Sequence, residues 1–191
     1  PLNALIESQR ERLHAWASGL GGRVRFALFN GDTPATRRQA RGGSTQVELR
    51  NRRDIRGLPP EILVTNVTML EYLLLRPADA SILQASQGAL RWIVLDEAHT
   101  YAGAQAAEMA LLLRRVRAAF GVTPGQVRLV ATSATIGGEN DAQDRLRDFL
   151  AALAGQPAPS VEVIEGRAAE PALPPPGPDT PLAPDTLAGL D

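Results

Sequence analysis

Two carboxylates and an imidazole directly follow a short apolar run near the middle of the chain. The run is Trp92–Leu95, and Asp96, Glu97 and His99 come after it. A short apolar run of strong β-formers predicts a fully buried strand, and the carboxyl end of such a strand is where open α/β sheets place their ligands. An aspartate there can hold Mg²⁺ through water beside nucleotide phosphates. A neighbouring glutamate can orient and deprotonate a water molecule, and His99 can sense the γ-phosphate or relay its loss.

The same residues have plainer interpretations. A single acid at a strand end is more often a solvated junction than a catalytic group. The whole string Asp96-Glu97-Ala98-His99, however, occurs by chance in a chain of this length at roughly 10⁻³. A metallohydrolase that uses Asp96 and His99 is the weaker alternative, because the chain has only 2 histidines and offers too few ligands. The string therefore favours a functional site.

A second motif lies about one helix further along the chain. Ser133, Ala134 and Thr135 follow the apolar run 127–131, and such a tripeptide gains weight when it follows a strand. The two strings together resemble motifs II and III of the DEAH-box helicases of superfamily 2. That resemblance implies ATP and Mg²⁺ as cofactors, with the metal held by Asp96 through water.

The resemblance also implies a role for each residue of the two strings. Glu97 would activate the attacking water, so the catalytic residues would be Asp96, Glu97 and His99. Motif III couples the nucleotide state to movement along the nucleic acid. The coupling residues would be Ser133, Ala134 and Thr135, acting with His99.

Three stretches upstream resemble motifs through which this family contacts the nucleic-acid backbone. Residues 1–5 resemble motif Ia, the turn cluster 30–34 resembles motif Ib, and residues 60–66 resemble motif Ic. The last likeness is to a subgroup of DNA-repair and defence-associated helicases that carry a C-terminal accessory domain. The residues that would face the backbone are Pro1, Asn3, Gly31, Asp32, Thr65 and Asn66.

Each of these stretches also has a structural interpretation. Residues 2–20 have the apolar spacing of an ordinary amphipathic helix, and 30–34 can be a plain surface turn. Asn66 or Thr68 can simply cap the next helix, Thr68 in a capping box with Glu71. Capping and phosphate binding at a strand tip do not exclude one another.

The composition narrows the function classes. The chain has 191 residues, a net charge of −1 and no cysteine, so it has no global electrostatic attraction to nucleic acid or anionic membranes and no disulfide. All 20 basic residues are arginine, yet a P-loop needs a lysine. We therefore expect either a protein that is not an ATPase or a part of a longer protein downstream of the P-loop. No apolar run approaches ~20 residues, which predicts a cytoplasmic protein without a membrane partner.

Arginines crowd one segment, residues 37–56. This segment can be a basic loop that lies along phosphates or a solvated, mobile surface loop, and the sequence leaves both open. Base stacking is not expected, because no aromatic residue interleaves with the arginines. Arg114, Arg115 and Arg117, near the end of a predicted helix, are interpreted as a solvated face.

The predicted fold is α/β with a largely parallel sheet flanked by helices. The expected strands are 24–29, 62–65, 92–95, 127–131 and 161–164, and the alternation with helices is typical of a parallel sheet. By resemblance, residues 1–165 would be a partial first RecA-like domain and 166–191 a proline-rich linker or disordered tail. The partners would be DNA in preference to RNA, and a second RecA-like domain of the same parent chain. The alternative is a nucleotide-independent module that binds nucleic acid or protein and keeps a relic motif II.

Overall fold

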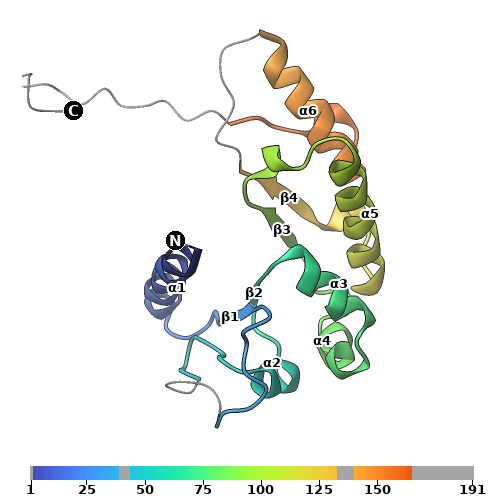
Figure 1. The fold of residues 1–191 in the computed structure, drawn as a ribbon. Coiled ribbons are helices and arrows are strands. Elements are labelled where there is room, and N and C mark those ends of the chain that lie inside the picture. The colour runs from blue at the N-terminus through green and yellow to red at the C-terminus, as the bar shows by residue number, and fades with distance from the viewer. Residues whose placement is uncertain (1, 39–43, 133–139, 165–191) are drawn as a thin grey trace, which may run out of the picture.

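The computed structural model describes residues 2–38, 44–132 and 140–164, and it describes side chains from residue 8 onward except those of 140–142. Four short strands and six α-helices follow one another along this part of the chain (Figure 1). The α-helices are α1 Leu2–Gly19, α2 Arg52–Gly57, α3 Val67–Leu75, α4 Ala80–Ala85, α5 Ala104–Ala119 and α6 Asn140–Ala154. The strands are β1 Phe26–Phe29, β2 Ile62–Thr65, β3 Trp92–Leu95 and β4 Arg128–Ala131.

The strands form two parallel pairs. In one, β1 lies beside β2 with Phe26 opposite Ile62. In the other, β3 lies beside β4 with Trp92 opposite Arg128. Because parallel neighbours require a crossover, helices separate the strands of each pair. The predicted α/β class with parallel strands is confirmed.

One apolar core joins the two strand pairs. Its buried side chains come from β1 and from helices α2 to α6, with Phe29, Ile55, Leu73 and Leu113 almost inaccessible to water. Partly buried residues of β2, β3 and β4 pack against this cluster. All four strands therefore pack against a shared set of helices.

Strand β3 is only half buried, so the prediction of a fully buried strand is wrong. Ile93 and Leu95 pack against the core, whereas the exposed fraction is 53% for Trp92 and 63% for Val94. Alternate residues of a strand face opposite sides, and the helices of the described residues cover one side of the β3–β4 pair (Figure 1).

The observed bounds of the other elements differ in part from the predicted ones. Strands β2 and β3 have the predicted bounds, β1 and β4 are shorter, and helices α2 and α4 were not anticipated. Residues 161–164 form no strand. A 3₁₀ helix, Ala158–Ser160, follows α6 instead. The chain after it pairs with no described strand, and Ile164 is 81% exposed.

Most arginines of the predicted basic segment that the structure describes have structural partners. Arg52 donates from Nη2 to the Asn30 carbonyl at 2.8 Å and from Nε to the Thr33 carbonyl at 3.0 Å. Arg56 lies 2.7 Å from the fully buried carboxylate of Asp79. A mobile loop is therefore the wrong interpretation for these arginines, because their guanidinium groups hold α2 against its neighbours.

Buried arginine–carbonyl and arginine–carboxylate contacts also fix the elements beside the strands. Glu48, 3% exposed, accepts from Arg10 of α1 at 2.6 Å and contacts Arg50 at 2.7 Å. Arg117, assigned to a solvated face from sequence, is buried instead and donates to the Ala154 carbonyl at 2.6 Å, so α5 is tied to the end of α6. None of the described helices combines the length and apolarity that a membrane span needs.

Candidate functional site

The acidic string leaves the carboxyl end of β3 through an unusual backbone conformation. Glu97 has φ of 51° and ψ of 47°, which is the left-handed region, and no other described non-glycine residue has a positive φ. A 3₁₀ turn, Ala98–Thr100, follows. Thr100 supports the turn by donating from both its backbone nitrogen and its hydroxyl to the Glu97 carbonyl, at 3.0 and 2.8 Å. The turn holds the side chains of Asp96 and Glu97 at the strand end, where both are exposed.

Thr132, at the end of β4, binds the acidic string directly. Its hydroxyl donates to Oδ1 of Asp96 at 2.6 Å and accepts from the backbone nitrogen of Glu97 at 3.1 Å. Its carbonyl also accepts from the nitrogen of Ala98 at 2.8 Å. Thr132 was not among the residues predicted from the sequence, although its position directly before Ser133 was an available signal.

His99 and Glu97 are brought together by the same turn. Nδ1 of His99 lies 3.2 Å from Oε2 of Glu97, and both side chains are accessible, at 36% and 56%. An imidazole in contact with a carboxylate can restrain its orientation and respond to its charge. The predicted trio of Asp96, Glu97 and His99 is therefore adjacent in space as well as in sequence.

The donor set at this edge fits a metal bound through water. Oδ1 of Asp96 is held by Thr132, and Oδ2 has no partner among the described residues, so one oxygen is open to solvent. The described residues contain no group of three or more side chains that could enclose a metal. Mg²⁺ commonly keeps several waters and uses one or two carboxylates together with substrate phosphates.

A second group of predicted residues follows β1. Asn30 and Thr33 form a closed turn in which the Thr33 hydroxyl donates to the Leu28 carbonyl at 2.9 Å and the Asn30 side chain accepts from the nitrogen of Asp32 at 3.0 Å. Gly31 and Asp32 stand exposed at its tip. A side chain at Gly31 would meet nothing within 4 Å, so the backbone there is open to an approaching ligand.

The end of β2 supplies the remaining residues. Thr65 donates its hydroxyl to the Phe29 carbonyl at 2.7 Å, which ties the carboxyl ends of β1 and β2 together. The side chain of Asn66 accepts from the nitrogen of Met69 at 2.8 Å and caps α3. The capping interpretation is thus correct for Asn66, and the box proposed for Thr68 does not form because the helix begins at Val67.

Several predicted residues cannot be placed in this geometry. Pro1, Ser133, Ala134 and Thr135 lie outside the described residues. Asn3 lies in the first turn of α1, and its side chain is also outside them. The structure therefore brings together two groups: Asp96, Glu97 and His99 after β3, and Gly31, Asp32, Thr65 and Asn66 after β1 and β2.

Comparison with known proteins places this geometry in a family. A family model described as DEAD/DEAH box helicase matches residues 1–143. The Druantia protein DruE of Escherichia coli (strain UMEA 4076-1) is 33% identical over 173 residues, which cover 86% of this chain and 9% of that protein. The chain thus spans less than a tenth of the length of this relative, and no solved structure matches it. Together with the parallel strands and flanking helices of a RecA-like fold, the match over most of its length shows that this chain belongs to the DEAD/DEAH box helicase family.

Proposed function

We propose that this chain forms the catalytic edge of an ATP-dependent nucleic-acid helicase or translocase, and that Asp96, Glu97 and His99 act in nucleotide hydrolysis. One observation carries the proposal: two exposed carboxylates stand side by side at a strand end, and one threonine hydroxyl binds Asp96 and the backbone of Glu97. Such an arrangement holds two acids in fixed positions while leaving them open to a ligand, as positioned catalytic groups require.

The chemistry assigns a separate task to each acid. Glu97 orients a water molecule and accepts its proton as the water oxygen attacks the γ-phosphorus and the bond to the ADP oxygen breaks. Asp96 would hold Mg²⁺ through water with the oxygen that Thr132 does not bind. When bound, Mg²⁺ neutralises charge on the phosphates. His99 restrains the Glu97 carboxylate through the 3.2 Å contact.

Coupling to movement follows from the position of Thr132. Its hydroxyl is hydrogen-bonded to the Asp96 side chain and to the backbone nitrogen of Glu97. The next residues in the chain are Ser133, Ala134 and Thr135. We assign coupling to these three residues, with His99, because a displacement of the acids would be transmitted through Thr132 to the residue that directly precedes Ser133 in the chain.

Nucleic-acid binding is assigned to the carboxyl ends of β1 and β2. Gly31 and Asp32 lie at an open turn, and Thr65 and Asn66 lie at a strand end tied to that turn through Phe29. Pro1 and Asn3 would join this surface by their likeness to motif Ia. We propose DNA as the preferred nucleic acid, with RNA as the alternative.

In this proposal the phosphate cradle comes from elsewhere in the polypeptide. The chain has no lysine, so it cannot supply the P-loop lysine that holds the β- and γ-phosphates. We propose that residues 1–165 act as a RecA-like unit of a longer protein that also provides the P-loop and a second RecA-like domain, and that 166–191 serve as a linker.

The test is hydrolysis by the natural protein that contains these residues. Glu97→Gln should lower the DNA-stimulated ATP hydrolysis rate by about 10²–10⁴-fold while leaving nucleic-acid affinity within twofold. Glu108→Gln, an exposed change on α5, is the matched control and should leave the rate unchanged. The 191-residue chain alone should hydrolyse no ATP. An unchanged rate for Glu97→Gln would contradict the proposal.

A second candidate function is favoured by the missing lysine. The chain would then bind nucleic acid or a protein partner without nucleotide, and motif II would be a relic. In that case neither ATP nor Glu97→Gln would change the behaviour of the natural protein in any assay.

A further inference from the structure

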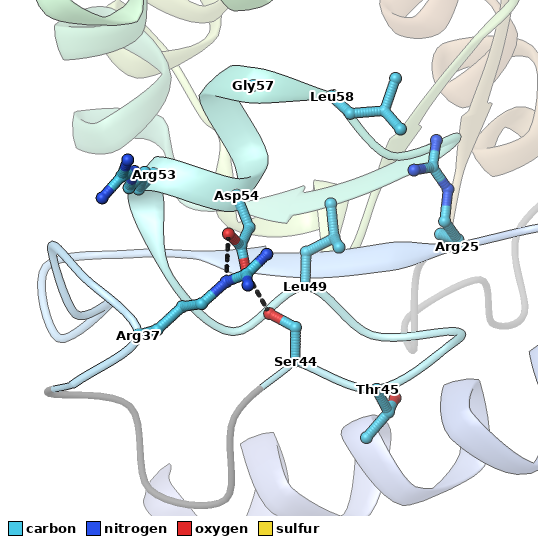
Figure 2. Close-up of a pocket in the computed structure, with 9 residues that line it drawn as sticks. All are labelled: Arg25, Arg37, Ser44, Thr45, Leu49, Arg53, Asp54, Gly57 and Leu58. Atoms are coloured by element: carbon cyan, nitrogen blue, oxygen red, sulfur yellow. Dashed lines mark hydrogen bonds and ion pairs between the residues drawn. The ribbon is translucent and has the colours of Figure 1, made fainter.

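A hollow with an excess of positive charge lies beside the turn that follows β1. It has a volume of about 560 Å³ and is lined by Thr36, Arg37, Arg38, Arg53 and Asp54. We call these five residues the basic hollow. A larger hollow of about 700 Å³ shares Arg37, Arg53 and Asp54 with it and continues toward Arg25 (Figure 2). The lining has three arginines and one carboxylate, so the basic hollow has a net positive charge.

The arginines of this surface divide into bound and available groups. Arg38 and Arg53 are exposed, and their guanidinium groups bind no other part of the chain that the structure describes. Arg37 lies 2.9 Å from Asp54, but its side chain is 77% exposed. Asp54 is only 10% exposed, but it also accepts hydrogen bonds from Ser44 and Asn51, so it keeps two partners if the exposed Arg37 turns toward a phosphate. Figure 2 shows Arg37 directed at Asp54 and Arg53 extending away from it at the end of α2.

Hydrogen bonds hold the floor of the basic hollow. Asp54 accepts from the side chains of Ser44 at 2.7 Å and Asn51 at 2.8 Å. The backbone nitrogen of Arg53 donates to the Ala35 carbonyl at 3.2 Å, so the two sides of the hollow are joined.

The basic hollow lies close in the chain to the turn of the proposed nucleic-acid surface. Arg52, the residue before Arg53, donates to the carbonyls of Asn30 and Thr33, the turn that carries Gly31 and Asp32. A strand of nucleic acid that follows the carboxyl ends of β2 and β1 thus reaches the basic hollow next.

We propose that the basic hollow binds successive phosphates of a single-stranded nucleic acid, extending the contact surface beyond the residues that resemble family motifs. The inference rests on the proposed function for the identity of the polyanion. The planar guanidinium group donates in a fork that matches phosphate oxygens. The lining residues are all polar and none is aromatic, so binding is to the backbone and independent of base sequence.

The experiment measures fluorescence anisotropy of labelled oligo(dT) with the 191-residue chain over a series of KCl concentrations. Arg38→Ala with Arg53→Ala should weaken binding about tenfold and reduce the slope of log K against log[KCl] by about 1.4, since each phosphate contact on a single strand contributes ~0.7. Arg38→Lys with Arg53→Lys keeps both charges and should restore the slope. Circular dichroism checks that each variant is folded.

The matched control removes two exposed arginines on other helices, Arg12→Ala of α1 with Arg114→Ala of α5. It should change the slope by less than half as much. The inference would be overturned if the two pairs of substitutions changed the slope equally, or if the Arg38 and Arg53 substitutions left it unchanged. It would also be overturned if the unsubstituted 191-residue chain bound no oligonucleotide at low salt. Hydrolysis that depends on Glu97 would still stand in those cases, so the two failures are distinguishable.

Discussion

Glu97 combines an accessible carboxylate with a backbone conformation that a side chain opposes. The left-handed region costs an L-residue roughly 1–2 kcal/mol, and such strain persists at functional sites because the surrounding structure holds it. Here the holding groups are the Thr132 hydroxyl and carbonyl and the bonds that Thr100 makes to the Glu97 carbonyl. In this turn the Glu97 carboxylate lies 3.2 Å from Nδ1 of His99.

This strain predicts that replacing Glu97 with glycine stabilises the fold. Glu97→Gly should raise the free energy of unfolding by about 0.5–1 kcal/mol, because relief of the left-handed strain exceeds the greater entropy of the unfolded chain. Urea denaturation of the 191-residue chain measures it. Glu97→Gln keeps the Cβ and serves as the control with unchanged stability. A glycine variant no more stable than the glutamine variant would show that the turn is unstrained.

Thr132 is expected to act as a positioning residue through its hydroxyl. Thr132→Val removes both hydrogen bonds of that group, and the amide of Glu97 should then exchange with solvent about fivefold faster, the equivalent of one net hydrogen bond. Exchange followed residue by residue by NMR gives the rate. Thr132→Ser keeps the hydroxyl and should preserve the slow exchange. If serine and valine behave alike, the methyl group and not the hydroxyl supports the turn.

At the scale of elements, a buried carboxylate joins α1 to the strands. Glu48 forms a parallel bridge with Phe26 through its backbone, and its side chain contacts Arg10 and Arg50. His14 of α1 packs its ring edge-on against Phe26, with centroids 6.5 Å apart. The helix that carries Asn3 is thus fixed to β1 by polar contacts as well as by the small apolar cluster of Ala17, Phe26 and Val47.

Removing the charge of Glu48 should therefore loosen α1. Glu48→Gln leaves two arginines beside a neutral amide in a buried place, which should lower the free energy of unfolding by about 2–4 kcal/mol. Thermal and urea denaturation measure the loss. Glu11→Gln removes an exposed carboxylate from the same helix and should change stability by less than ~0.5 kcal/mol. If both variants lost the same free energy of unfolding, the buried ion pairs of Glu48 would contribute no more stability than an exposed carboxylate does.

The elements themselves were predictable to different degrees. Strand β2 was predictable because proline and a helix cap bracket its apolar run, and α5 because its apolar spacing continues over four turns. Helices α2 and α4 are six residues each, too short to show a period, and α2 depends on the Asn51 cap and on arginine contacts with distant carbonyls. The expected strand at 161–164 failed because β-propensity alone does not supply a partner strand.

At the scale of the whole molecule, hydrogen-bonded carboxylates set the response to acid. Burial acts to raise the pKa of Asp54, but hydrogen bonds from Ser44, Asn51 and Arg37 outweigh it, and the pKa is lowered. The hydrogen bond and charge of Arg25 lower the pKa of Glu61 in spite of its partial burial. Both carboxylates therefore bind protons less readily in the folded than in the unfolded chain, so stability is full above their ordinary pKa values of ~4 and falls below them.

The double variant Asp54→Asn with Glu61→Gln tests this linkage. It should be less stable than the parent at pH 7 and should lose less stability between about pH 5 and pH 3, because two of the groups that take up protons on unfolding are gone. Urea denaturation at a series of pH values gives both slopes. Glu108→Gln on α5 is the control and should follow the parent curve. If the stability of the double variant fell with pH as steeply as that of the unsubstituted chain, other groups would be responsible for the loss of stability in acid.

The sequence by itself determined where the proposed site lies, because short apolar runs, turn residues and the string of acids are local features that need no knowledge of packing. It determined the α/β class for the same reason, since strands and helices alternate along the chain. Only the tertiary structure decided which groups meet. Thr132 reaches Asp96 across 36 residues, Glu48 is buried between α1 and β1, Arg117 is buried beside the end of α6, and one face of β3 stays exposed. Each of these depends on how packed elements approach one another, and local propensity carries no information about contacts between residues far apart in the chain.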